Sequence, residues 1–559
     1  MRQISRAAQF AAAMLVLAAA GASAQARDPK LVIIVAVDQM RGDYVDRFQR
    51  QWSAGLKRLV TEGAWFRQAD YPYFNTVTCA GHASISTGTV PAVHGMVLNE
   101  WYDQAEKRVV SCTEDDSQTF ISYGAPVAGG SHSAARLQAL TLADELRLQH
   151  PGAPRVVTIA MKARSAINLA GHHPDVVTWL DDSGSWVTST AFAKAPVPFI
   201  ADYLRAHPIA AEFGRVWDRT LRKEQYLYDE STVGMRPPKV GSMSFPHPIK
   251  SREAWESSPL SDAYTAGLAI AALDALKLGR GPGTDFLGIS FAALDKVGHD
   301  FGPHSHEVQD ILINLDRQLG ILLDKLDRDL GRDGYTLALS ADHGVSPNPE
   351  RVRELGFESG RIDVRKLAAA LEETLARELG GANAAAGTPA SSRKYVATIQ
   401  HTDVYFQPGV YQQLVENPKA LDAAMAVVRQ TPGVWRVYGR ETLLAGDNDL
   451  DPIVRAAARS YFDGRSGDLV LLPRAYWITS SSTTTHGTGH RYDTRVPVIL
   501  FGHGIRPGQY LQPASPIDIA PTLAFLSSVT LSDPMGRVLI EALDPSRAAR
   551  IDTPHGPQR

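Results

Sequence analysis

The chain has few cysteines and little net charge. It contains only 2 cysteines in 559 residues, and its formal net charge at pH 7 is −3. A balance so close to neutral provides no basic surface for a nucleic-acid polymer and no cationic face for a membrane. The sequence also lacks repeats of solenoid period and runs of like charge. With 44% hydrophobic residues, it is typical of a globular protein, either one large domain with insertions or several smaller domains.

The most apolar run lies near the N-terminus and is too short to cross a bilayer. The run FAAAMLVLAAA follows Arg2 and Arg6 and leads to the small residues ASA at positions 22–24. A transmembrane helix needs about 20 apolar residues, whereas this order of basic, apolar and small residues is typical of a secretory signal peptide. We therefore expect residues 1–24 to be removed by cleavage near Ala24. The mature protein should be periplasmic or secreted, without stable membrane insertion.

Export would place the two cysteines in an oxidising compartment. Cys79 and Cys112 are 33 positions apart. In the chain-entropy model, closing a loop of that length stabilises a fold by about 3 to 4 kcal/mol. The sequence therefore predicts a Cys79–Cys112 disulfide, with two buried thiols as the alternative.

Short apolar runs rich in β-branched residues alternate with helical patterns. The helical pattern is clearest at Val308 to Leu326, where apolar residues recur at spacings of three and four. This alternation predicts an α/β fold, with a mostly parallel, doubly wound sheet and helices on both faces. Ligands bind such sheets at the carboxyl ends of the strands. The predicted strands are 31–38, 155–161, 285–291, 335–342 and 496–502.

Two stretches break the alternation and are expected to be insertions near the site. Residues 181–259 are rich in aromatic residues and proline, and residues 347–480 contain a second β/α block. Within the second block, the composition of GGANAAAGTPASSR at 380–393 predicts a flexible linker. The core domain would then consist of three parts, residues 25–180, 260–346 and 481–559.

Acidic residues and histidines lie next to several predicted strands. Each aspartate alone could be a helix cap or a turn residue, but three of them with three histidines at one sheet edge predict a metal site. Mixed carboxylate and imidazole ligands suit Zn²⁺, with Mn²⁺ as a less favoured substitute. Six ligands suffice for two ions, which is the arrangement used in phosphoryl transfer. These residues are Asp38, Asp295, His299, Asp342, His343 and His486.

Several segments of the sequence resemble the alkaline phosphatase superfamily. They are VAVDQMRGDY, NTVTCAGHASISTG, VLNEWYD, KARSAINLAG, ALDKVGHDFGPHS, ALSADHGV and TTTHGTGHRYDTRVPVILFG, and they run from residue 38 to about residue 525 with the closing SPIDIAPTLAFL. The set is similar to the branch of exported, phosphate-irrepressible alkaline phosphatases that use a threonine nucleophile. This resemblance implies an alkaline phosphatase-like core with inserted caps, and hydrolysis of phosphate monoesters with release of inorganic phosphate.

The resemblance also implies how the ligands divide between two zinc ions. One ion would be held by Asp295, His299 and His486. The second would be held by Asp38, Asp342 and His343. The oxygen of Thr78, which the resemblance implies is the nucleophile, would also bind this second ion. A zinc ion lowers the pKa of a hydroxyl that is otherwise a weak nucleophile, and the reaction would pass through a phosphothreonine.

Two neighbours of Thr78 are alternative nucleophiles. Thr76 carries a second hydroxyl, and Cys79 carries a thiol. A nucleophilic cysteine would suggest a sulfatase, in which C/S-x-P-x-R is the site of formylglycine formation. Cys79 is followed by AGH instead, without the proline or the arginine, so the sequence disfavours the sulfatase interpretation.

The resemblance implies that Asn99, Lys162 and Arg164 contact the transferred phosphate. A monoester keeps its full negative charge on the terminal oxygens, which an arginine binds with two hydrogen bonds and a lysine as a point charge. Small-molecule phosphate monoesters are therefore the expected substrates. The alternatives are a phosphodiesterase or nucleotide pyrophosphatase of the same superfamily, a phosphomutase, and a non-catalytic zinc- or phosphate-binding protein.

Three further histidines lack the spacing expected of ligands. His82 and His94 are expected to pack in the core or to support the ligands. His490 lies four residues after His486, where the family usually has other residues. We expect a structural role for His490, with a ligand of a third metal as the alternative. We also expect the protein to be a monomer.

Overall fold

The structure is a computed structural model that describes residues 28–380 and 394–545. The predicted signal peptide lies outside the described residues, as does the predicted linker from residue 381 onward. Among the described helices, none has the length and apolar character that a membrane span requires.

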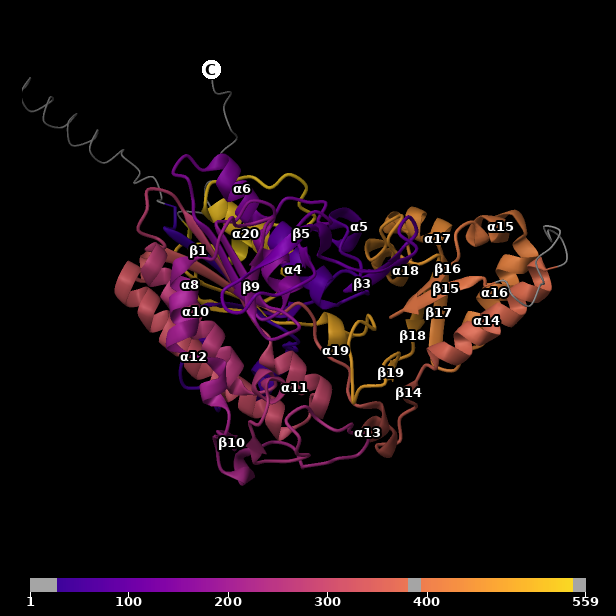
Figure 1. Cartoon of the computed structure of the whole chain (residues 1–559), viewed down its shortest axis with the longest axis horizontal. Coiled ribbons are helices and arrows are strands. Elements are labelled where there is room, and N and C mark those ends of the chain that lie inside the picture. Colours follow the sequence, from indigo (N-terminus) through magenta and orange to yellow (C-terminus); the bar gives the residue numbers. More distant parts are fainter. Residues whose placement is uncertain (1–27, 381–393, 546–559) are drawn as a thin grey trace, which may run out of the picture.

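An 11-stranded sheet forms the body of the protein (Figure 1). In spatial order its strands are β21 (Gly508–Ala514), β2 (Ala64–Ala69), β20 (Val498–Gly502), β13 (Tyr335–Ser340), β1 (Leu31–Val37), β12 (Asp285–Phe291), β7 (Val156–Ala160), β8 (Val176–Leu180), β9 (Trp186–Ser189), β5 (Glu114–Ser122) and β6 (Gly130–His132). The central strands from β13 to β8 are all parallel. The predicted doubly wound α/β fold is confirmed, although most pairs toward the two edges are antiparallel.

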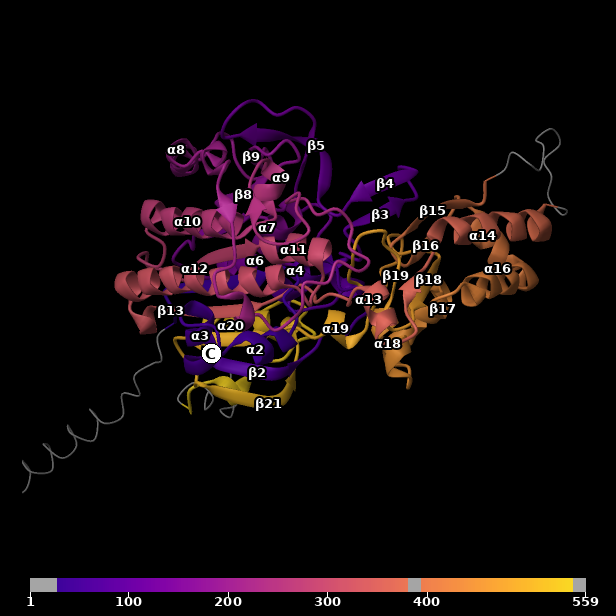
Figure 2. The ribbon, with the colours of Figure 1, turned by 90° about the horizontal axis from the view of Figure 1, so that it is seen from below.

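Helices cover both faces of the sheet, which explains why its central strands are apolar throughout. Every residue of β1 and β12 is buried, as expected for parallel strands with helices on either side. Figure 2 shows α10 (Pro259–Leu276) and α12 (His306–Leu330) side by side over one face. The other face packs against α4 (Thr78–Thr87), α6 (Leu142–Gln149) and α20 (Ile519–Leu526).

A second, smaller unit lies beside the body, on the right in Figure 1. It contains an antiparallel sheet in the order β15 (Val396–Gln400), β16 (Asp403–Phe406), β18 (Leu469–Pro473) and β17 (Val434–Gly439). Helices α14 (Val364–Leu379) and α16 (Pro418–Gln430) share an apolar core with this sheet. We call residues 364–478 the cap. They fall within the predicted insertion 347–480.

The first predicted insertion, residues 181–259, differs from the structure at its start. Strand β9 lies within this range and pairs with β8, so it belongs to the main sheet. A tight turn joins the two strands, in which the side chain of Asp181 accepts a hydrogen bond from the Ser185 N–H at 2.7 Å. Only later do short elements without sheet pairing to the body appear, such as β10 (Val216–Trp217) and β11 (His247–Pro248).

Candidate metal and phosphate site

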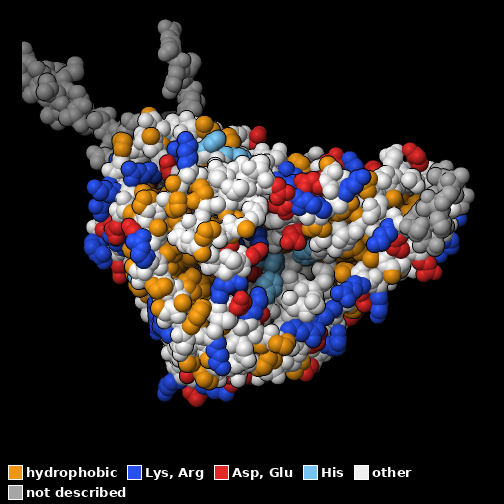
Figure 3. All heavy atoms as spheres, viewed as in Figure 1, with side chains coloured by type: hydrophobic (Ala, Val, Ile, Leu, Met, Phe, Trp, Pro, Cys, Tyr) orange, Lys and Arg blue, Asp and Glu red, His pale blue; other side chains and the backbone are white. Residues whose placement is uncertain are grey.

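Three of the predicted ligands lie where neighbouring parallel strands end. Asp38 directly follows β1, and Asp342 lies two residues after β13. Asp295 lies in the first turn of α11 (Ala293–Phe301), the helix that follows β12. All three side chains are buried. Figure 3 shows histidine side chains at the floor of a hollow between the body and the cap.

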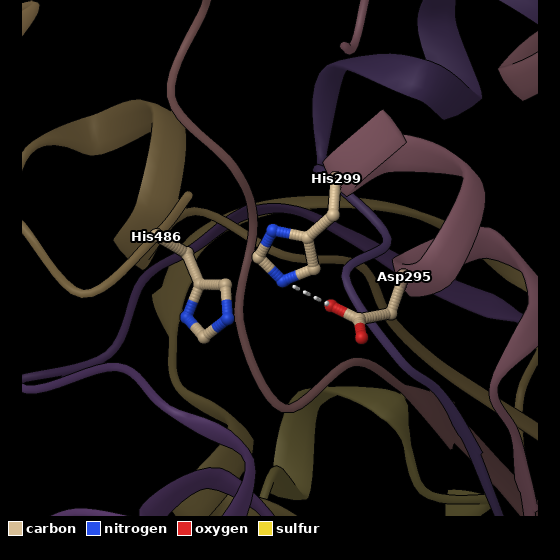
Figure 4. Close-up of side chains that lie close together, drawn as sticks. All are labelled: Asp295, His299 and His486. Atoms are coloured by element: carbon tan, nitrogen blue, oxygen red, sulfur yellow. Dashed lines mark ion pairs between the residues drawn. The ribbon is translucent and has the colours of Figure 1, made fainter. Parts of the chain in front are cut away.

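Asp295, His299 and His486 form a first group that could hold a metal ion (Figure 4). One ligand atom from each side chain lies within 4.8 Å of the others. Asp295 and His299 are one helical turn apart on α11, and His299 Nε2 lies 3.2 Å from Asp295 Oδ1. His486 comes from the loop that precedes β20, and its ring centroid is 5.2 Å from that of His299.

Asp38, Asp295 and His343 form a second such group. His343 Nε2 lies 3.4 Å from Asp38 Oδ1 and 3.4 Å from Asp342 Oδ2. The structure therefore brings together all six predicted ligands. It differs from the predicted division, because Asp295 belongs to both groups and Asp342, although close to His343, belongs to neither.

The three candidate ligand histidines present the same nitrogen to the site. Nδ1 lies 2.9, 2.9 and 3.0 Å from a backbone carbonyl oxygen in His299, His343 and His486, respectively. A carbonyl can only accept a hydrogen bond, so Nδ1 is the protonated nitrogen in each neutral ring. The lone pair is then on Nε2, which is free to bind a metal, and the carbonyl fixes the orientation of the ring.

Buried atoms without partners support a metal at this site. Asp38 Oδ1 and His343 Nε2 are buried and have no hydrogen-bond partner among the described residues. Unpaired buried acceptors are costly. Burial, together with Asp295 and Asp342, raises the pKa of Asp38 to about 7. Burial and the neighbouring imidazoles hold the pKa of His486 well below its usual value, so this ring is neutral, as a ligand must be. A divalent cation would satisfy these lone pairs and offset the repulsion between the carboxylates.

Lys162 and Arg164 follow β7 and lie at the start of α7 (Ala163–Ala170). Lys162 Nζ is 2.5 Å from Asp38 Oδ2 and 2.6 Å from Asp295 Oδ2. Burial lowers the pKa of Lys162, but these two carboxylates outweigh it and raise the pKa, so the ammonium group is charged. Arg164 is half-buried, and its Nε has no hydrogen-bond partner among the described residues.

Thr78 is the first residue of α4 and is buried. The preceding residue makes no side-chain cap, and the N–H groups of a helix N-terminus attract anions. The Cys79 N–H donates a hydrogen bond to Asn99 Oδ1 at 2.9 Å, which places Asn99 beside the nucleophile candidate. A β-carbon on Gly81 would lie 2.1 Å from the Asp342 carbonyl oxygen, so only glycine lets α4 approach the strand end this closely.

The two alternative nucleophiles differ in how they are held. Cys79 forms a disulfide with Cys112, so the predicted bridge is present and Cys79 is not a free thiol. The Thr76 hydroxyl lies 3.4 Å from the Phe74 carbonyl oxygen. The Thr76 carbonyl oxygen lies 3.0 Å from His486 Nδ1, so its backbone supports a ligand.

Comparison with known proteins places the chain in a family. A family model described as type I phosphodiesterase / nucleotide pyrophosphatase matches residues 32–495. The chain belongs to this family. The match agrees with the alkaline phosphatase superfamily predicted from the motifs.

Several individual relatives can be aligned with almost the whole chain. Alkaline phosphatase PafA of Elizabethkingia meningoseptica is 30% identical over 532 residues, which are 92% of this chain and 94% of the relative. A protein of Myroides odoratus named calcium-transporting ATPase is 31% identical over 526 residues, which are 90% of this chain and 92% of the relative. The crystal structure of wild-type alkaline phosphatase PafA is similar with a TM-score of 0.83 at 28% identity, covering 93% of this chain and 99% of that one.

The sequence did not predict that Gln39 and His401 lie near the site. Gln39 has a positive φ of 69°. Its N–H donates to Asp342 Oδ1 at 3.1 Å, and its Nε2 donates to Asp295 Oδ1 at 2.7 Å. His401 of the cap lies against the loop that carries His486, because a β-carbon on Gly487 would lie 2.2 Å from His401 Nε2. The only signal in the sequence was that Gln39 follows Asp38.

The other histidines take different positions. His82 Nε2 lies 2.8 Å from Ser290 Oγ, and His82 Nδ1 lies 3.2 Å from Asp342 Oδ2, so this ring supports a ligand. His94 Nε2 lies 3.0 Å from Ser84 Oγ, within the core. His490 Nε2 lies 3.0 Å from the Pro473 carbonyl oxygen, and His490 is in neither metal-binding group of the described residues. These contacts agree with the expected packing and supporting roles.

The disulfide allows a stability prediction. Replacing both Cys79 and Cys112 by alanine should lower the free energy of unfolding by about 3 kcal/mol, because a loop of 33 residues is no longer closed in the unfolded chain. Urea unfolding followed by circular dichroism measures the change. Wild-type protein unfolded in the presence of a reductant is the control and should match the variant. A loss below about 1 kcal/mol would contradict the prediction.

Proposed function

We propose that this protein is an exported alkaline phosphatase that hydrolyses phosphate monoesters at a two-zinc site, with Thr78 as the nucleophile. The observation that carries the proposal is a set of buried carboxylates and imidazoles, some with unpaired ligand atoms, around the strand ends against which the N-terminus of α4 packs. The likeness to alkaline phosphatase PafA over more than nine-tenths of both chains supports it.

The residues of the chain have separate tasks in this proposal. Zinc ions held by the two groups would supply Lewis acidity that activates the nucleophile and the leaving group. Thr78 Oγ attacks phosphorus, the alcohol leaves, and a phosphothreonine forms. Water then hydrolyses this ester, which releases inorganic phosphate and restores Thr78. Asn99, Lys162 and Arg164 bind the terminal oxygens of the phosphate, and burial excludes competing water.

A phosphodiesterase or nucleotide pyrophosphatase is the second candidate, favoured by the description of the matching family model. The same metal ligands would serve both reactions. Lys162, which lies against Asp38 and Asp295, and Arg164, two residues further along the chain, favour the monoester, because a monoester carries more charge on its terminal oxygens. The relative named calcium-transporting ATPase is compatible with this preference, since ATP hydrolysis also transfers a terminal phosphoryl group.

A double variant distinguishes these two candidates. Lys162→Ala with Arg164→Ala should lower kcat/KM for an aryl phosphate monoester about a hundredfold or more. Each charge-assisted hydrogen bond to the phosphate is worth about 1.5 to 3 kcal/mol, and neighbouring effects are not fully additive. The kcat/KM for the matching diester should fall far less. Steady-state kinetics with both substrates checks this prediction.

The metal content of the double variant must be measured alongside the kinetics. Lys162 lies against Asp38 and Asp295, so its removal could change zinc binding and lower both activities together. Equal losses of monoester and diester activity in a fully metallated variant would contradict the selectivity role and favour the phosphodiesterase.

We also propose that the chain is exported to the periplasm or medium after cleavage near Ala24, and that it acts as a monomer. Its substrates would be small phosphate monoesters rather than nucleic-acid polymers. N-terminal sequencing of the secreted protein tests the cleavage site, and sedimentation tests the oligomeric state. A mature sequence that still contains the apolar run would contradict the proposed cleavage.

A further inference from the structure

The four residues before Thr78 connect the nucleophile candidate to a metal ligand. We call residues 74–77, FNTV, the strap. All four are buried. The strap leads directly into Thr78 at the start of α4, and the Thr76 carbonyl oxygen lies 3.0 Å from His486 Nδ1. A shift of the strap would therefore displace both Thr78 and His486.

A buried polar network joins the strap to the cap. The Thr402 hydroxyl lies 3.2 Å from Asn75 Oδ1 and 3.0 Å from Asp403 Oδ2. Asn75 Nδ2 lies 3.5 Å from Asp403 Oδ2. The Gly467 N–H donates to Asp403 Oδ1 at 2.8 Å, which fixes the carboxylate within the cap. Thr402 lies in the turn between β15 and β16, Asp403 is the first residue of β16, and both are buried.

The cap holds the strap by its backbone as well. Ser460 Oγ accepts hydrogen bonds from the N–H groups of Phe74 and Asn75, at 2.8 and 3.2 Å. The Phe74 side chain packs in an apolar cluster with cap residues that include Tyr461 and Leu472. The cap also contacts the loop that carries His486, because His401 packs against Gly487.

The contact between the strap and the cap is more polar than simple packing of two units would require. Apolar contact would suffice for docking, whereas a buried carboxylate, amide and hydroxyl are costly unless their hydrogen bonds are made in one geometry. Asp403 illustrates the cost, because burial raises its pKa to about 6 despite the hydrogen bonds from Gly467, Thr402 and Asn75. Such a network fixes the position of the strap relative to the cap more than it stabilises the fold.

We propose that Thr402 and Asp403 of the cap are positioning residues that hold the strap, and through it Thr78 and His486, in the geometry required for phosphoryl transfer. The catalytic part of this inference rests on the proposed function. The structural part, that these residues immobilise the strap, does not. The two parts are tested by separate measurements.

The first measurement is kinetic. Thr402→Val keeps the shape of the side chain and removes its hydroxyl. It should lower kcat for an aryl phosphate about tenfold and leave KM nearly unchanged, because the nucleophile is misplaced while Asn99 and Arg164 still bind the phosphate. Thr402→Ser keeps the hydroxyl and should restore most of kcat. Thr374→Val is the matched control, since Thr374 is a buried threonine of α14 in the cap, and among the described residues no hydrogen bond joins it to the strap.

The second measurement is hydrogen exchange of the strap, which needs no activity. The Phe74 and Asn75 amides, protected by Ser460, should exchange several-fold faster in Thr402→Val than in the wild type or in Thr374→Val. If the wild type hydrolyses no phosphate monoester, the proposed function fails while this measurement still decides the structural part.

Two results would overturn the inference. One is a folded Thr402→Val variant whose kcat and strap exchange both stay within about twofold of the wild type. The other is an equal loss of kcat in Thr374→Val, which would show a general effect of cap stability. If Thr402→Val does not fold, Asp403→Asn takes its place. It keeps the side-chain size and replaces one acceptor oxygen, and it should give the same loss of kcat and the same faster exchange.

Discussion

Removal of metal by a chelator should abolish phosphatase activity, and addition of Zn²⁺ should restore it. All the candidate ligands except the partly exposed His299 are buried, and Asp38, Asp295 and Asp342 repel one another without a divalent cation. A threonine hydroxyl is also too weakly acidic to attack phosphorus unaided. The expected loss is on the order of a thousandfold or more. It is measured with an aryl phosphate after dialysis against chelator and again after Zn²⁺, Mn²⁺ or Mg²⁺ is added.

A pair of histidine variants provides the control for metal binding. His486→Ala removes a predicted ligand and should lower the zinc content of the purified protein. His490→Ala changes a histidine only four residues away. Because His490 Nε2 is hydrogen-bonded to the Pro473 carbonyl oxygen, this variant should leave the zinc content unchanged. Full activity in a chelated sample shown by mass spectrometry to be free of metal would contradict the two-zinc site.

Much of the fold could be predicted because the central strands are buried on both faces. An apolar run rich in β-branched residues, such as LVIIVAV in β1, is typical of a parallel strand that is covered on both faces. The edge strands gave no such signal. Strand β5, EDDSQTFIS, is polar and only partly buried, and β9 is a short run of four residues. Strand β9 follows β8 through a tight turn, but its pairing with β5 joins segments that are far apart in the sequence, which a local pattern does not encode.

The positions of the three candidate ligand carboxylates could be predicted for a geometrical reason. The carboxyl ends of parallel neighbours lie at one edge, so Asp38, Asp295 and Asp342 had to converge once their strands were assigned. The role of Gln39 could not be predicted, because it depends on a positive φ that the residue type disfavours. The approach of His401 could not be predicted either, since it depends on how the cap packs against the body.

Thr78→Ala should lose nearly all turnover of phosphate monoesters. Without the hydroxyl no phosphothreonine forms, and loss of a covalent nucleophile costs on the order of a thousandfold or more. Thr78→Ser keeps a hydroxyl at the start of α4 and should retain much of the activity. Rapid acid quench with labelled substrate, followed by peptide mapping, should find the phosphate on Thr78 in the wild type and none in Thr78→Ala.

Thr76→Val is the matched control for this experiment. The Thr76 hydroxyl has only a long contact with the Phe74 carbonyl oxygen, at 3.4 Å, whereas the contact with His486 uses the backbone carbonyl, which the substitution keeps. This variant should therefore retain zinc and most of its kcat. Zinc content must also be measured in Thr78→Ala, because Thr78 Oγ is itself a predicted ligand. Phosphate recovered on Thr76, or a fully metallated Thr78→Ala with wild-type kcat, would show that the reaction does not use Thr78 as its nucleophile.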